Sequence, residues 1–200
     1  MKIKSIITAA VALLVSTACN GGAKQEKVMN KDSKAIVVFF SHAGDNYAVG
    51  NIEVGNTKIV ADYITELTGA GQFEIVTHKY DGMASTPLTQ LAQKEANDKE
   101  LPAYEGKAPD LSEYDTVFIG GPVWWGTYPQ VMFTLFKDIN LDGKTIYPFT
   151  THEGSGLANC VSDVKKAFPK ASVQNGFSIY GHEVRSEKAK VVNWLKQIGF

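Results

Sequence analysis

Three short segments of this chain combine residue types that can hold a phosphorylated, planar ligand. The first is split into Ser41-His42-Ala43-Gly44 and Gly55-Asn56-Thr57, and its second half directly precedes a helical pattern. Free N–H groups and the dipole at a helix N-terminus favour an anion, so a phosphate there requires no lysine or arginine. An ordinary helix N-cap is the commoner meaning of Gly55-Asn56-Thr57, so this segment alone does not establish a ligand site.

The second segment is Gly120-Gly121-Pro122-Val123-Trp124-Trp125-Gly126, and it continues to Pro129. Two adjacent tryptophans cannot both point into the same layer, so one can enter the core while the other covers a flat ring. The glycines leave the backbone free to approach such a ring. Packing of both tryptophans around a proline-containing turn explains the segment equally well.

The third segment, Thr150-Thr151-His152-Glu153-Gly154-Ser155-Gly156, is small and polar. Its backbone N–H groups can bond the polar edge of a ring system, and His152 is the candidate catalytic residue because it can donate a proton near neutral pH. A solvated loop histidine and a Ser155 helix cap are the alternatives. A hydrolase using Ser155 and His152 is disfavoured, because Glu153 and Leu157 stand where a nucleophile elbow has glycine.

Strands and helices must bring these segments together. Continuous apolar runs predict buried strands, and apolar residues at helical spacing follow them. The predicted strands are 35–40, 73–76, 116–119, 145–149 and 177–180, and the predicted helices begin near residues 57, 86, 129, 157 and 191. This alternation predicts a three-layer α/β domain with a doubly wound, five-stranded parallel sheet. The three segments follow the first, third and fourth strands, and such sheets bind ligands at the carboxyl ends of strands.

Over residues 35–200 this arrangement resembles the flavodoxin-like family. Gly121 to Thr127, with Pro129, is similar to the loop beside the isoalloxazine ring in the family's short, reductase-like branch, and it is the most specific motif. The resemblance implies the strand order 2-1-3-4-5 and FMN as the cofactor, and we predict no metal site. It assigns FMN contacts to Ser41, His42, Gly55, Asn56, Thr57, Gly121, Pro122, Val123, Trp124, Trp125, Gly126, Thr150, Thr151, His152, Glu153 and Gly154.

The first loop departs from the family pattern. Residues 45–54 separate its two halves, and Gly50-Asn51 competes with Gly55-Asn56 for the family's Gly-Asn pair. Gly55-Asn56 fits better, because Thr57 and an amphipathic helix follow it directly. The insertion either forms a lid over the phosphate or disrupts its seat.

Charge helps to choose between functions. The formal net charge of −1 gives no basic field for nucleic acid, and loss of Lys2 and Lys4 with a leader lowers it by two, to −3. Electron carriers of this fold are usually strongly acidic, so the weak charge favours an FMN-dependent reductase over a carrier.

NAD(P)H is the candidate electron donor of such a reductase, and a quinone is the candidate acceptor. A binding module that has lost FMN is the alternative. A phosphoacceptor receiver domain is disfavoured, because Ser41 stands where it has aspartate.

The first residues predict export. A basic start, an apolar run from Ile6 to Val15 and small residues before Cys19 are typical of a bacterial lipoprotein leader. An ordinary secretory signal with an incidental Cys19 is the alternative. We expect an exported, membrane-anchored lipoprotein on the periplasmic or cell-surface side. Its parts are a signal peptide at 1–18, the lipidated cysteine and a flexible tether at 19–34, and the FMN-binding domain at 35–200.

Overall fold

The computed structural model describes residues 34–200. Predictions for the leader at 1–18, for lipid on Cys19 and for the tether up to residue 33 lie outside the described residues. Within residues 34–200, no helix combines the length and the apolar character needed to cross a membrane.

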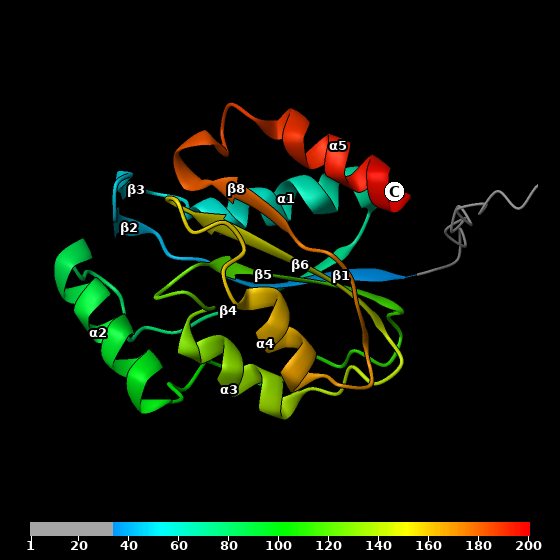
Figure 1. The fold of residues 1–200 in the computed structure, drawn as a ribbon, viewed down its shortest axis with the longest axis horizontal. Helices are drawn as coiled ribbons and strands as arrows, with labels where there is room; N and C mark the ends of the chain where they lie inside the picture. The colour runs from blue at the N-terminus through cyan, green and yellow to red at the C-terminus, as the bar shows by residue number, and fades with distance from the viewer. Residues whose placement is uncertain (1–33) are drawn as a thin grey trace, which may run out of the picture.

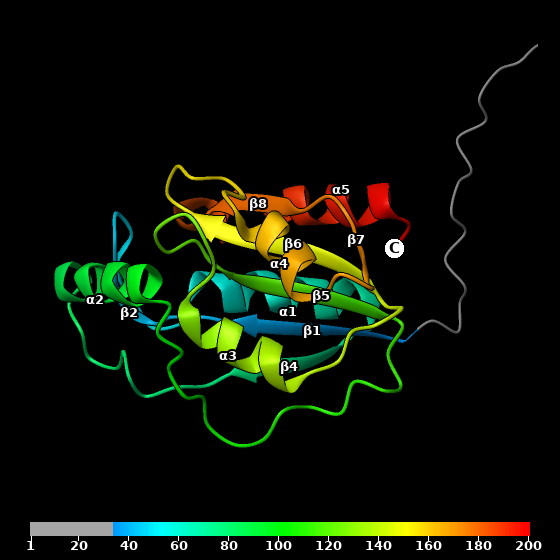
Figure 2. The same ribbon diagram turned by 60° about the horizontal axis from the view of Figure 1, so that its bottom comes forward.

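A parallel sheet forms the middle layer (Figures 1 and 2). In spatial order its strands are β4 (Gly71–Ile75), β1 (Ala35–Phe40), β5 (Thr116–Pro122), β6 (Thr145–His152) and β7 (Ser172–Val173), and β8 (Phe177–Tyr180) also pairs with β6. This order confirms the predicted 2-1-3-4-5 topology. The fifth position is divided, because β7 pairs with the start of β6 and β8 with its end, so six strands form the sheet where five were predicted.

Helices cover both faces of the sheet, as the apolar strands predict. One face carries α1 (Asn56–Thr68) and α5 (Lys188–Ile198), and the other carries α3 (Gln130–Asp138) and α4 (Cys160–Ala167) (Figure 1). Every residue of β1 is buried, and alternate residues belong to two separate apolar clusters. A strand apolar on both sides belongs between two helical layers. The predicted fold class is therefore confirmed.

Helix α2 (Ser85–Asp98) departs from this plan. It lies beyond the carboxyl edge of the sheet, beside a small hairpin made of β2 (Gly44–Asn46) and β3 (Gly50–Ile52) (Figures 1 and 2). The backbone N–H of Ser85 donates to the Asp45 carboxylate at 2.8 Å and ties α2 to the hairpin. The hairpin is the insertion in the first loop, so insertion and helix stand together at the edge where the sequence predicts a ligand.

Candidate functional site

The two halves of the first loop meet in space. Ser41, which follows β1, accepts a hydrogen bond through Oγ from the backbone N–H of Lys58 at 3.0 Å. Gly55 has no side chain with which to cap α1, so Ser41 caps the helix from the loop that follows β1. A Cβ atom on Gly55 would lie 2.2 Å from Ser41 Oγ, so only glycine fits without displacement. The rival pair Gly50-Asn51 lies in the hairpin, away from any helix start.

Two threonine side chains join α1 to the end of β6. Thr57 Oγ1 and Thr151 Oγ1 lie 2.8 Å apart, and both side chains are buried. Thr150 is turned away, because its Oγ1 donates to the carbonyl oxygen of Gly156 at 2.9 Å. Thr151 therefore faces the first loop, while Thr150 shapes the third loop from within.

A cation that is not among the predicted site residues lies beside the start of α1. Arg185, in the segment after β8, donates from Nη1 to Asn56 Oδ1 and from Nη2 to the carbonyl oxygen of Val54, both at 2.9 Å. These bonds orient the Asn56 side chain and place positive charge beside the N-terminus of α1. The predicted site segments follow the first, third and fourth strands, whereas Arg185 follows the fifth.

His42 has a buried ring nitrogen that is not satisfied by the protein. The residue is 8% exposed, and its Nε2 has no hydrogen-bond partner among the described residues. Burial lowers the pKa of His42, although Asp81 and Asp45 act in the opposite direction. The imidazole is therefore neutral near pH 7. A buried ring nitrogen without a partner is suited to bond a ligand.

The second loop closes in a tight turn. Trp124 and Thr127 exchange backbone hydrogen bonds of 2.9 and 3.3 Å around Trp125 and Gly126. The φ angles of these central residues are +53° and +80°, the left-handed pair that a two-residue hairpin turn needs. A tryptophan in this conformation is uncommon and costs energy, so the surrounding contacts must hold it there.

The adjacent tryptophans have different surroundings. Trp124 packs edge-on against the rings of Phe40 and Tyr80, with centroids 5.6 and 5.1 Å away. Trp125 is 51% exposed, and its Nε1–H donates to the carbonyl oxygen of Thr89 on α2 at 2.7 Å. Trp124 is thus the packed residue of the pair, and Trp125 fastens the turn to α2.

Gly120 and Gly121 have a packing role that the sequence did not reveal. A Cβ atom on Gly120 would lie 1.9 Å from the ring of Phe149, and one on Gly121 would lie 2.6 Å from Met132 Sδ. The sequence suggested that these glycines leave room for a ligand ring. In the structure, the close approach that they permit is to buried side chains of the core.

The third loop is fixed from two sides. His152 Nδ1 accepts the backbone N–H of Gly154 at 2.9 Å, so the neutral ring carries its proton on Nε2, and burial lowers the pKa of His152. The His152 ring also contacts the ring of Tyr180, with centroids 4.5 Å apart. The Glu153 carboxylate lies 2.7 Å from His182 Nδ1 and accepts the His182 backbone N–H at 3.0 Å. The segment after β8 therefore holds this loop in place.

Two adjoining cavities lie among these residues. The first measures about 100 Å³, and the predicted residues that line it are His42, Asn56, Thr57, Pro122, Val123, Trp124, Thr151, His152 and Glu153. The rest of its wall is formed by residues that were not predicted, namely Asn46, Tyr47, Val49 and Gly181. The second cavity measures about 230 Å³, and Trp125 and Gly126 line it. Five predicted residues line neither cavity: Ser41, Gly55, Gly121, Thr150 and Gly154. Ser41 and Thr150 bond neighbouring backbone groups through their hydroxyls, Gly154 donates its backbone N–H to His152, and Gly55 and Gly121 permit close packing.

Comparison with known proteins agrees with this geometry. A proposed flavoprotein from Bacteroides eggerthii is 27% identical, with a TM-score of 0.64 over 84% of this chain and 99% of its own. Another from Bacteroides uniformis is 25% identical, with a TM-score of 0.63 over 83% and 99%. A flavoprotein from Lactobacillus acidophilus, solved in complex with FMN, is 20% identical, with a TM-score of 0.55 over 78% and 99%. No curated protein sequence matches significantly. The flavodoxin family model matches residues 34–198, and the chain belongs to the flavodoxin family.

Proposed function

We propose that this chain is an FMN-dependent oxidoreductase, exported and held at a membrane by lipid on Cys19. The observation that carries the proposal is that the N-terminus of α1, joined to Ser41, meets Thr151 and His152 at one cavity on the carboxyl edge of the sheet. The Lactobacillus acidophilus protein, which has the same fold, was solved with FMN and supports this choice of cofactor.

The residues of the first cavity fit the phosphate end of FMN. Backbone N–H groups at the start of α1 supply donors, as does His42 in the tautomer that carries its proton on Nε2, and Arg185 adds positive charge through Asn56. Glu153 also lines the cavity, but both of its oxygens are already bonded to His182. A phosphate therefore finds donors and a nearby cation, and it faces no carboxylate that is free of partners.

The second and third loops would hold the rest of FMN. A cavity of about 100 Å³ suits the phosphate and the polyol chain, and it is too small for three fused rings as well. We therefore assign the ring system to the space outside this cavity, next to the backbone of Pro122–Trp124 and Thr151–Glu153, which are among the residues that line it. When bound, the flavin supplies electron transfer in one-electron or two-electron steps, which no side chain can provide.

His152 acts in this proposal as a neutral hydrogen-bond donor. Its Nδ1 is committed to Gly154, so only Nε2–H is available to a ligand. The lowered pKa keeps the ring neutral near pH 7, so His152 stabilises negative charge on a reduced ligand without delivering a full positive charge. We expect His152→Phe to lower reductase turnover and His152→Gln, which retains a donor, to keep more of it.

Titration of the full chain with FMN tests the cofactor assignment. We expect binding heat, quenching of flavin fluorescence and one FMN per chain. Arg185→Gln should weaken FMN binding about tenfold, because the positive charge beside the phosphate and the bond that orients Asn56 are lost, while riboflavin affinity stays unchanged. Lys188→Gln is the matched control, because Lys188 pairs with Glu66 at the surface. A chain that shows neither heat nor quenching would be a binding module without FMN, and the proposal would fail.

Two further measurements test the remaining parts. Turnover of NAD(P)H with a naphthoquinone, in the absence of any partner protein, is expected of a reductase, and its absence would indicate an electron carrier. Anchoring predicts that the full chain sediments with membranes and that Cys19→Ser releases it. A Cys19→Ser chain that stays in the membrane fraction would contradict lipid attachment at that residue.

A further inference from the structure

The second cavity differs in chemistry from the first. It lies between α2 and the turn at Trp125, and it measures about 230 Å³. Leu88 and Ala92 of α2 form one side, the two adjacent tryptophans form another, and no acidic or basic side chain lines it. An ionised ligand would lose its hydration here without gaining a charged partner. The cavity therefore favours an uncharged molecule.

The size and the wall of the second cavity narrow the ligand class. A cavity of about 150 Å³ lined by apolar side chains accommodates benzene, so about 230 Å³ suits one or two fused rings. Indole faces are flat surfaces on which such rings stack. The wall also includes the polar residues Ser85, Ser155 and Asn46, to which oxygen substituents of a ring can bond.

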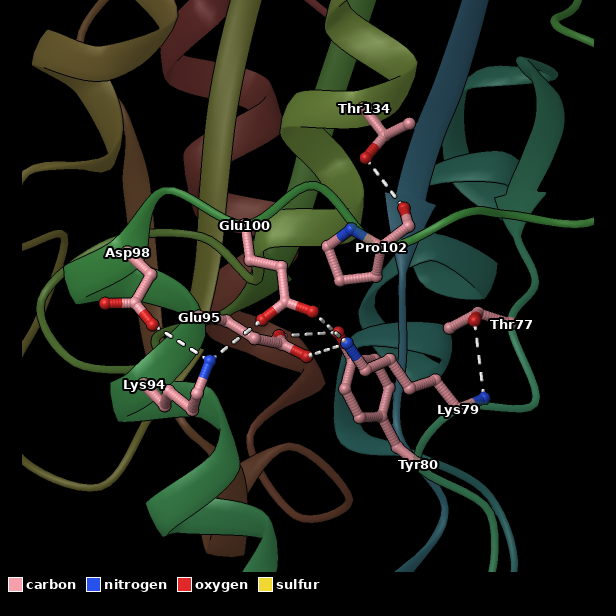
Figure 3. A network of polar contacts seen from close by, with 9 residues as sticks. All are labelled: Thr77, Lys79, Tyr80, Lys94, Glu95, Asp98, Glu100, Pro102 and Thr134. Carbon is pink, nitrogen blue, oxygen red and sulfur yellow. Dashed lines mark hydrogen bonds and ion pairs between the residues drawn. The ribbon is translucent and has the colours of Figure 1, made fainter.

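A polar network around Glu95 joins α2 to Lys79 and Tyr80 (Figure 3). Glu95 on α2 is fully buried, accepts the Tyr80 hydroxyl at 2.9 Å and lies 2.8 Å from Lys79 Nζ. The Tyr80 ring in turn meets Trp124 edge-on at 5.1 Å. These contacts join the helix wall to the tryptophan wall, so the cavity is formed before any ligand arrives.

The two cavities share a wall. Asn46, Tyr47, Val123 and Trp124 line both of them. We propose that the second cavity binds an uncharged aromatic molecule of one or two fused rings with oxygen substituents, and that this molecule is the electron acceptor. The acceptor role depends on the proposed function, whereas the binding site does not. An aromatic dione bound there takes a hydride equivalent derived from a nicotinamide donor and a proton from water, and it leaves as the diol.

Binding of 2-naphthol, which is not reduced under these conditions, tests the site with the full chain. We expect saturable quenching of tryptophan fluorescence both with and without FMN. Ala92→Leu, which extends a buried α2 side chain into the cavity, should weaken 2-naphthol binding about tenfold and leave FMN affinity unchanged. Gln93→Leu, an exposed neighbour on the same helix, should change neither.

The outcomes separate this inference from the proposed function. Absence of saturable 2-naphthol binding to the wild-type chain would overturn the inference, even if FMN binds. Displacement of FMN by 2-naphthol, or an equal loss of both affinities in Ala92→Leu, would show that the cavity holds the flavin itself and would also overturn it. If FMN does not bind but 2-naphthol does, the aromatic site stands and the FMN-dependent role falls. Because the wild-type titration decides these points, the test does not depend on the folding of Ala92→Leu.

Discussion

The bond between Thr57 and Thr151 offers a direct test of how the site is assembled. It joins the start of α1 to the end of β6 through two hydroxyl groups 2.8 Å apart, in side chains that are 1% and 4% exposed. Replacing either residue with valine keeps a β-branched side chain of similar size but removes one hydroxyl. The other hydroxyl then remains buried without its partner, and an orphaned polar group costs more than the bond itself contributes.

The expected magnitude follows from that burial. Thr57→Val or Thr151→Val alone should lower the free energy of unfolding by about 1–3 kcal/mol. For a domain of this size, each kcal/mol lowers the melting temperature by about 2–4 °C. The double variant removes both polar groups, so it should be more stable than the sum of the single losses predicts, with a coupling energy of about 0.5–3 kcal/mol. FMN affinity should fall in the single variants and should not recover in the double variant, because both threonines line the cavity proposed to hold the phosphate.

Urea unfolding, followed by circular dichroism, measures the four free energies of this double-mutant cycle, and calorimetry gives the FMN affinities. Additive losses, within about 0.5 kcal/mol, would show that the two hydroxyls do not depend on each other. Single variants as stable as the wild type would show that water replaces the missing partner. Recovery of FMN affinity along with stability would remove the threonines from the ligand site.

Three further predictions concern single residues. Gly55→Ala should lower the free energy of unfolding by about 1–3 kcal/mol and weaken FMN binding, because its Cβ would lie 2.2 Å from Ser41 Oγ. An unchanged midpoint in urea unfolding would contradict this. Glu95→Gln should cost about 1–3 kcal/mol, because a fully buried group loses its charge-assisted bonds to Lys79 and to the Tyr80 hydroxyl, and thermal unfolding at pH 7 measures the loss. Burial lowers the pKa of His42 from 6.5, so the unfolded chain binds a proton there more readily than the folded chain. The contribution of His42 to the free energy of unfolding is therefore complete above about pH 7, and it decreases as the pH drops through 6.5. In urea unfolding at several pH values, His42→Gln should show a smaller decrease over this range.

The parts of the fold that the sequence predicts are those set by local patterns. The apolar run of β1 requires cover on both faces, which indicates a sheet between helical layers. Gly55 before an amphipathic run locates the start of α1 to within one residue. Strand order follows once the family resemblance is added. The division of the fifth strand between β7 and β8 leaves no comparable signal, because each piece is very short.

Side-chain partners that are distant in the chain could not be predicted in this way. Arg185 reaches Asn56 across 129 positions, and only the sheet order brings them together. The helical pattern of α2 indicates which residues are buried, but it does not say that they face Trp125 in place of the sheet. Glycine is ambiguous in the same way, because a sequence shows that a side chain is absent without showing what occupies the space. Gly120 illustrates this, since the ring of Phe149 takes that space.

The insertion supports the site that it interrupts. Ser41 still caps α1 across the gap, so the proposed phosphate site does not depend on an uninterrupted loop through residues 45–54. Within the insertion, Asn46 Nδ2 donates to the carbonyl oxygens of His42 and Gly44 at 3.3 and 3.0 Å and so holds the start of the hairpin to the end of the first half of the loop. Asn46 and Tyr47 then line both cavities. Of the two roles that the sequence allows, we propose the lid, because a ligand in either cavity would meet these two residues of the insertion.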